Sequence, residues 1–138
     1  MRVTVPHDYQ PNEAEPFMNP VMQEYFRQKL LRWREQLVRE SNDTLVHLQT
    51  ESLHEPDITD RASLESDRAL ELRTRDRARK LISKIDEALK RIEDGSYGYC
   101  EETMQPIGVK RLEARPIATL SIEAQERHER MERIYRDD

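Results

Sequence analysis

The chain has 138 residues, a formal net charge of −5, 37% charged residues and 36% hydrophobic residues. This length suits one ordinary domain or a small domain with a long projection, and the charge-rich composition favours elongated helices over a thick core. The negative charge argues against direct, sequence-specific DNA binding, because that requires a dominant basic face.

Cysteine usage and hydropathy exclude further classes of protein. One cysteine excludes an intramolecular disulfide framework. No segment is long and apolar enough to span a membrane, and the first residues lack the apolar run of a signal peptide. We therefore expect a cytoplasmic protein without membrane contact.

Residues 1–19 carry three prolines and scattered charges without any period, which predicts an extended or partly disordered N-terminal arm. A loose terminus is the favoured interpretation, and docking through Phe17 and Met18 is the alternative. Pro20 suits the first turn of a helix, and no further proline follows before Pro56. The helix predicted from 20 to about 53 has an apolar band of helical period, formed by Phe26, Leu30, Leu31, Trp33, Leu37, Val38, Leu45 and Leu48.

The chain reverses near 55–60, in an acidic stretch. Pro56 interrupts a continuous helix, while Asp57 and Asp60 are residue types that begin one. A second helix is predicted from about 61 to 93, with a coiled-coil seam of Leu81, Ile82, Ile85, Ala88, Leu89 and Ile92. Both apolar bands are strongest far from the reversal, which predicts an antiparallel coiled-coil hairpin over 20–94 with its tip near 55–62. Each helix of this finger would be about 50 Å long.

Basic residues follow one flank of the second helix at steps of three, four and seven. They are Arg73, Arg77, Lys80, Lys84 and Arg91. From spacing alone, the favoured interpretation is a solvated face that balances acidic residues of the partner helix. The alternative is a contact for phosphate or for an acidic protein surface.

Glycine occurs only between 95 and 108, which marks a shift to a small, turn-rich module over 95–120. Its apolar side chains are Tyr97, Tyr99, Ile107, Val109 and Leu112. Ser121 can then cap a C-terminal helix over 121–138, with Glu123 in the first turn, where the helix dipole favours a negative charge. The predicted fold class is mainly α.

Catalytic and metal-binding motifs are missing. The sequence has no phosphate-binding glycine loop, catalytic triad or histidine-pair metal motif. Asp57 and Asp60 are oxygen ligands of the kind that magnesium prefers, but helix capping and turn chemistry explain them equally well. We expect no enzymatic activity.

Several separated motifs point to one family. They are Pro56-Asp57-Ile58-Thr59-Asp60-Arg61-Ala62-Ser63, Leu70-Glu71-Leu72-Arg73-Thr74-Arg75-Asp76-Arg77, Gly98-Tyr99-Cys100-Glu101 and Arg111-Leu112-Glu113-Ala114-Arg115-Pro116. In this order, over about residues 17–124, the chain closely resembles the DksA/TraR family of bacterial transcription factors.

The resemblance implies a regulator that binds RNA polymerase and not DNA. Family members insert a coiled-coil finger into the secondary channel and alter open complexes at ribosomal RNA and amino-acid-biosynthesis promoters. They act together with guanosine tetraphosphate, the alarmone of the stringent response. By resemblance, the tip residues that act near the polymerase active centre are Asp57, Asp60 and Ala62.

The family's alarmone site, between the factor and the polymerase, maps by resemblance onto Leu81, Lys84, Arg115, Glu123 and Gln125. Lys84 and Arg115 can bind phosphates by charge-assisted hydrogen bonds. Family members commonly have lysine where this chain has Gln125, and an uncharged amide is a weaker phosphate partner.

The chain departs from the family at the zinc finger. Typical members carry two Cys-x-x-Cys pairs, a strong zinc signature. The matching positions here are Cys100, Thr103, Ser121 and Ala124. Hydroxyls are poor zinc donors and alanine is none, so we expect a module without zinc, held by apolar contacts and hydrogen bonds. Cys100 is then interpreted as a small buried packing residue and not as a redox sensor.

Two other functions rank below this interpretation. Gre-type transcript cleavage factors also carry acidic residues on a coiled-coil finger, but the Asp-Ile-Thr-Asp spacing is similar to that of DksA. A coiled-coil adaptor that pairs with another chain would be expected to keep its apolar heptads towards the tip, and this chain does not. We expect a monomer with no structurally bound cofactor.

Overall fold

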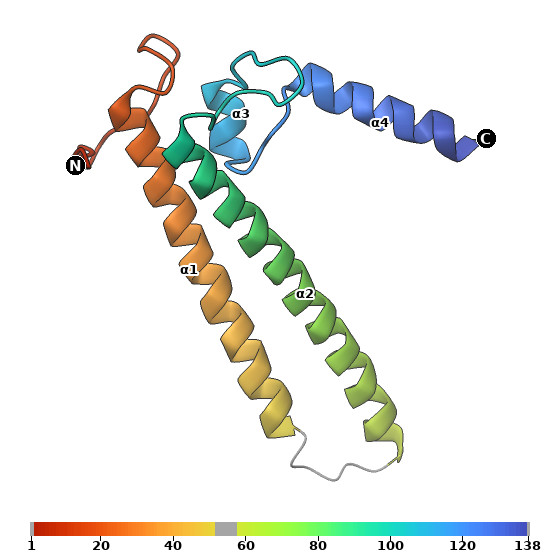
Figure 1. The fold of residues 1–138 in the computed structure, drawn as a ribbon. Helices are drawn as coiled ribbons and strands as arrows, with labels where there is room; N and C mark the ends of the chain where they lie inside the picture. The colour runs from red at the N-terminus through yellow and green to blue at the C-terminus, as the bar shows by residue number, and fades with distance from the viewer. Residues whose placement is uncertain (1, 52–57, 138) are drawn as a thin grey trace. The chain divides into compact units, whose positions relative to one another are not determined.

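The computed structural model describes residues 2–51 and 58–137, with side chains over 2–46 and 62–135. Its elements are α1 (Pro20–Glu51), α2 (Ile58–Asp94), α3 (Val109–Ala114) and α4 (Ile122–Asp137), as Figure 1 shows. No strand occurs in the described ranges, where Tyr99 and Pro106 form an isolated antiparallel bridge. The predicted mainly helical fold is confirmed.

Local chemistry explains where the two long helices begin and end. Asn19 caps α1, because its Oδ1 accepts hydrogen bonds from the N–H groups of Val21 and Met22, both at 3.1 Å. The backbone of α2 is already helical at Ile58, three residues before the expected start, since a proline does not restrict residues that follow it. Gly95, with φ of +85°, ends the helix. None of the described helices combines the length and the hydropathy needed to cross a membrane.

The chain divides into two compact units, and both long helices contribute to each. We call Leu31–Asp86 the finger unit, and Met1–Leu30 together with Glu87–Asp138 the globular unit. The finger unit therefore contains most of both helices. The globular unit contains the arm, one end of each helix, the turn-rich module and α4.

Within the finger unit the two helices run side by side and antiparallel (Figure 1). Leu37 and Ile85 are buried as the apolar period predicts, and Ala78 is buried as well. Leu31, assigned to the same band, is 38% exposed and lies at its edge. Arg34 Nε donates to Asp86 Oδ1 at 2.7 Å. Both partners are partly exposed, so this ion pair adds little stability and mainly favours one register.

The core of the globular unit combines residues of all its segments. Tyr97 lies at its centre: the ring is 5.8 Å from that of Phe26, and the hydroxyl donates to the Pro116 carbonyl at 2.8 Å. Burial raises the pKa of Tyr97 well above its ordinary range. The buried apolar residues are Met18, Met22, Phe26, Leu30, Ala88, Ile92, Tyr97, Cys100, Ile107, Val109, Leu112, Ile117, Ala118 and Ala124. Of the five expected module residues, Tyr99 alone is half-buried and the others are buried.

The N-terminal arm is packed within the globular unit, so the expectation of a loose terminus is wrong for residues 2–19. Met18 is buried, and the Phe17 ring meets Tyr99 edge-on with 5.5 Å between centroids. The docking alternative is confirmed. Nearer the terminus, Tyr9 lies 5.6 Å from Tyr25 in another edge contact.

Gly98 explains why the arm can approach so closely. Its φ is +91°, which favours glycine, and a Cβ at this position would lie 3.1 Å from Met18 Cε and 3.2 Å from Phe17 Cζ. A larger residue would therefore strain the backbone and also displace the arm.

The C-terminal helix α4 is exposed from Glu126 to Tyr135. Its sequence repeats glutamate followed four residues later by arginine, at Glu123/Arg127, Glu126/Arg130, Glu129/Arg133 and Glu132/Arg136. This order and spacing stabilise a helix that is exposed over most of its length. Ser121 begins it as expected: its Oγ accepts from the Ala124 N–H at 3.2 Å.

Candidate functional site

The predicted tip lies only partly within the described residues. Asp57 is outside the described residues. Asp60 has helical backbone in the first turn of α2, and Ala62, two residues later, is exposed on the same helix. The role of these residues stays a prediction.

The basic flank is open to solvent. Arg73, Arg77, Lys80 and Lys84 are exposed, and Arg91 is half-buried in the last turn of α2. In the part of the chain that the structure describes, none of these five forms an ion pair. The interpretation that they balance acids of the partner helix therefore has no support from direct contacts, and their positive charge is available to a partner.

The residues assigned to alarmone binding divide between the two units. Leu81, half-buried, and Lys84 belong to the finger unit. Arg115, Glu123 and Gln125 belong to the globular unit, where Gln125 Nε2 donates to Glu129 Oε1 at 3.3 Å. The joint site of these five residues stays a prediction.

Arg115 has a well-defined backbone and a free side chain. Its N–H bonds the Arg111 carbonyl at 2.7 Å, and its own carbonyl accepts from the Ala118 N–H at 3.0 Å. The Arg111 side chain fixes the same loop, because its Nε donates to the Leu120 carbonyl at 2.9 Å. The Arg115 side chain is exposed and makes no ion pair with any described residue. A guanidinium presented in this way can bind a phosphate.

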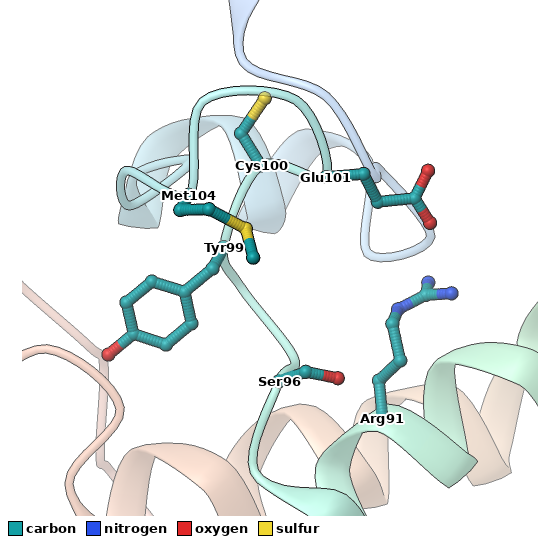
Figure 2. Close-up of a pocket in the computed structure, with 6 residues that line it drawn as sticks. All are labelled: Arg91, Ser96, Tyr99, Cys100, Glu101 and Met104. Atoms are coloured by element: carbon teal, nitrogen blue, oxygen red, sulfur yellow. The ribbon is translucent and has the colours of Figure 1, made fainter.

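Sequence reasoning missed an apolar pocket of about 420 Å³ in the globular unit, lined by Arg91, Ser96, Tyr99, Cys100, Glu101 and Met104. Figure 2 shows the Met104 side chain pointing into the space that Tyr99 and Arg91 border, whereas the Cys100 sulfur points away from it. Two signals in the sequence could have indicated it: a methionine in a loop of otherwise polar residues, and an arginine where the long helix ends.

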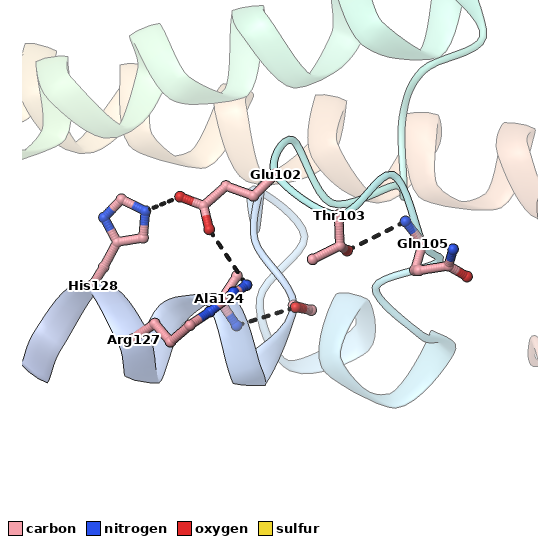
Figure 3. A network of polar contacts seen from close by, with 7 residues as sticks. Glu102, Thr103, Gln105, Ala124, Arg127 and His128 are labelled. Carbon is pink, nitrogen blue, oxygen red and sulfur yellow. Dashed lines mark hydrogen bonds and ion pairs between the residues drawn. The ribbon is translucent and has the colours of Figure 1, made fainter.

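Two of the other degenerate zinc positions, Thr103 and Ser121, contact the Cys100 sulfur. Cys100 is buried, and its sulfur accepts hydrogen bonds from the Thr103 hydroxyl and from the backbone N–H groups of Ser121, Thr103 and Glu102. Ser121 and Ala124 are also buried and are joined by the cap bond. Figure 3 shows this bond and the Thr103 Oγ1 accepting from the Gln105 N–H.

These side chains do not fit zinc. A tetrahedral structural site needs four nitrogen or sulfur ligands, or carboxylates in their place. Here the four positions carry one thiol, two hydroxyls and a methyl group, and the described residues contain no group of three histidine, cysteine or acidic side chains able to hold a metal.

The Cys100 thiol is more than the packing residue that the sequence predicts. Burial alone would raise the pKa, because it disfavours the thiolate. The Thr103 hydroxyl and the three backbone N–H groups favour the thiolate and outweigh burial, so the pKa is lowered from 9.0 to about 6. The lowered pKa favours the thiolate at neutral pH, and the hydrogen bonds to the sulfur join the 101–106 loop to the segment before α4.

We expect Cys100 to titrate with a pKa of about 6 in the folded protein and near 9.0 in denaturant. Because the folded pKa is the lower one, the thiolate stabilises the fold fully above pH 9, and this contribution is lost as the pH falls through 6. Thiolate absorbance near 240 nm measures the titration, and Cys100→Ser, which removes the sole cysteine, is the blank. A folded-state midpoint above 8 would contradict it.

The side chain of Glu102 links the 101–106 loop to α4. In Figure 3 its carboxylate faces His128 and Arg127, both on α4. The His128 ring bonds one oxygen, and Arg127 Nη2 lies 3.6 Å from the other. All three side chains are half-exposed, so this link orients α4 more than it stabilises the unit.

A second link orients α3, the helix that precedes Arg115. Lys29 Nζ donates to the Glu113 carbonyl at 3.0 Å and to Glu113 Oε2 at 2.8 Å. The first bond satisfies one of the free carbonyl groups at the C-terminal end of α3. The globular unit therefore holds the backbone before Arg115 through a charged side chain of α1.

Two family models match the chain. "DnaK suppressor protein DksA, N-terminal domain" matches residues 22–92, and "Prokaryotic dksA/traR C4-type zinc finger" matches residues 95–130. The RNA polymerase-binding transcription factor DksA of Caulobacter vibrioides (strain NA1000 / CB15N) is 69% identical over 131 residues, which cover 95% of this chain and 92% of that protein. The factor of the same name from Escherichia coli (strain K12) is 48% identical over 115 residues, which cover 83% of this chain and 76% of that protein.

A solved structure agrees with the fold. The transcription factor DksA2 from Pseudomonas aeruginosa matches with a TM-score of 0.81 and 44% identity, over 90% of this chain and 94% of that one. The helical architecture found here is therefore that of an experimentally determined relative.

Proposed function

The chain belongs to the DksA family of RNA polymerase-binding transcription factors, and we propose that it regulates transcription by inserting its finger unit into the secondary channel of RNA polymerase. It is a regulator that binds the polymerase and not an enzyme. The observation that carries the proposal is identity of 69% with a relative named for polymerase binding, over nearly the whole of both chains. We propose that it acts as a monomer in the cytoplasm, where the polymerase is.

The form of the finger unit supports entry into a channel. Helices of 32 and 37 residues form the hairpin, and the longer one extends for about 55 Å. An antiparallel pair of helices is narrow enough for a passage that excludes a globular domain. Asp57, Asp60 and Ala62 are then delivered to the region of the active centre, where carboxylates act on the open complex.

Guanosine tetraphosphate is the proposed co-regulator. Exposed Lys84 and Arg115, neither with an ion pair among the described residues, offer positive charges to its phosphates, and Leu81 offers an apolar contact. Because Gln125 is uncharged, we expect a weaker alarmone response than in a relative with lysine there.

The experiment that tests this function measures the lifetime of open complexes at a ribosomal RNA promoter with purified polymerase. We expect the protein to bind the polymerase and shorten the lifetime, and to shorten it further with the alarmone. An unchanged lifetime despite binding would overturn the proposed regulation at such promoters. Shortening of nascent RNA in backtracked complexes would indicate transcript cleavage instead.

We also propose that the protein works without zinc. The hydrogen bonds around the Cys100 sulfur and the buried Ala124 take the place of a metal centre. Elemental analysis of the purified protein is expected to find no stoichiometric zinc, and a chelator should leave its thermal unfolding and its effect on transcription unchanged. A four-cysteine relative should lose both under the same treatment. One zinc per chain in this protein would contradict the proposal.

A further inference from the structure

The pocket beside the 101–106 loop has no part in the function proposed above. Its volume of about 420 Å³ is mostly bordered by apolar surface, and Tyr99 and Met104 supply its walls. Figure 2 shows that both side chains border the same space, with Arg91 on its other side. A pocket of this size accepts one large apolar side chain.

The backbone of Met104 is in a conformation that destabilises the fold. Its φ is +62°, in the left-handed region that suits glycine and disfavours a side chain. The loop holds it there, because its N–H bonds the Cys100 carbonyl at 2.9 Å and the Cys100 N–H bonds the Gln105 carbonyl at 2.8 Å. The side chain is 74% exposed, so it buries little apolar surface in return. A strained, exposed apolar residue beside an apolar pocket is typical of a binding surface.

The pocket is bordered by one positive and one negative side chain. Arg91 is half-buried and Glu101 is exposed. Figure 2 shows the Glu101 carboxylate on the same side of the pocket as the Arg91 guanidinium, but the two form no ion pair among the described residues. Asp94, in the same turn as Arg91, accepts hydrogen bonds from the Ser96 hydroxyl at 2.6 Å and from the Ser96 N–H at 2.9 Å. The charge of Arg91 also acts on Asp94. Because no described carboxylate forms an ion pair with the Arg91 guanidinium, it can still bind a carboxylate that enters with an apolar group.

We propose that this pocket binds an apolar side chain flanked by a carboxylate on the surface of RNA polymerase. The inference rests on the proposed function and adds a contact of the globular unit to that of the finger tip. Met104 and Tyr99 hold the apolar side chain, and Arg91 binds the neighbouring carboxylate. Such a contact adds affinity without acting on the open complex.

Met104→Gly tests the apolar part. It removes the side chain and relieves the backbone, so affinity for purified core polymerase should fall about tenfold while the temperature of unfolding stays the same or rises. A purely structural role predicts the opposite: unfolding at lower temperature with affinity unchanged. Met104→Leu keeps an apolar side chain and should retain most of the affinity.

Arg91→Gln tests the charged part, with Lys90→Gln as the matched control. Lys90 is exposed, lies one residue away on α2 and does not line the pocket. At low salt, Arg91→Gln should weaken binding about threefold and Lys90→Gln should not. In the double variant with Met104→Gly the losses should be less than additive, because both side chains bind one segment of the partner.

The outcomes separate this inference from the proposed function. If wild type binds the polymerase and Met104→Gly and Arg91→Gln bind equally well, the pocket contact is wrong and the function stands. If Arg91→Gln and Lys90→Gln weaken binding equally, general electrostatic attraction explains the effect of Arg91, and the specific contact with a carboxylate is wrong. If wild type itself does not bind, the proposed function and this inference are both overturned.

Discussion

Asp60→Asn is expected to abolish the shortening of open-complex lifetime while leaving affinity for RNA polymerase unchanged within about twofold. Asparagine has the shape of aspartate without its charge. If the tip acts through a carboxylate near the active centre, as the family resemblance implies, the substitution removes the effect on the open complex and little of the binding surface. Loss of a negative charge from the first turn of α2 costs at most about 0.3–1 kcal/mol of stability.

Asp76→Asn is the matched control. It makes the same change of charge on α2, at an exposed residue whose ion pair with Arg79, at 3.7 Å, is weak. Binding measured with labelled protein and lifetime measured by promoter competition should separate the two variants. The tip mechanism fails if Asp60→Asn shortens the lifetime as wild type does, or if it loses binding as well.

Phe26→Ala is expected to destabilise the globular unit by about 3–5 kcal/mol, a large share of the stability of a small domain. The Phe26 side chain is fully buried. Its ring lies 5.2 Å from that of Tyr25, which contacts the arm, and 5.8 Å from that of Tyr97, which anchors the module. The truncation leaves a cavity among segments that are distant in the sequence, so none of them can fill it by a local shift.

Urea unfolding followed by circular dichroism measures this effect. Leu31→Ala is the control: it removes a large apolar side chain from the same helix, but Leu31 is 38% exposed and should cost less than about 1.5 kcal/mol. A similar cost for the two variants would show that Phe26 does not hold the arm and the module together.

Much of the fold was predictable because its signals are local. The ends of the long helices were predicted to within three residues. The signals were Pro20, the absence of proline between it and Pro56, and Gly95. The apolar period identified Leu37 and Ile85 as buried. The motifs that carry the family resemblance are also contiguous in sequence, so they indicate the family without any knowledge of how distant segments pack together.

The arm and the pocket were not predictable in the same way. A segment with three prolines and no period has no signal of its own, and it is ordered because Phe17 and Met18 find a surface beside Gly98. Met104 is an ordinary loop methionine in the sequence. Its positive φ and its place beside Tyr99 follow from backbone hydrogen bonds that close the 101–106 loop.

The sequence by itself determined the helical hairpin, the family and the absence of a zinc ligand set, because residue types and their spacing are sufficient for each. Only the tertiary structure decided what surrounds the Cys100 sulfur. The donors to the Cys100 sulfur are a hydroxyl and three backbone N–H groups, one of them at Ser121, on a segment well separated in sequence. Every residue but proline carries such an N–H, so composition cannot reveal which ones converge; folding alone brings them to the sulfur and makes the thiol acidic.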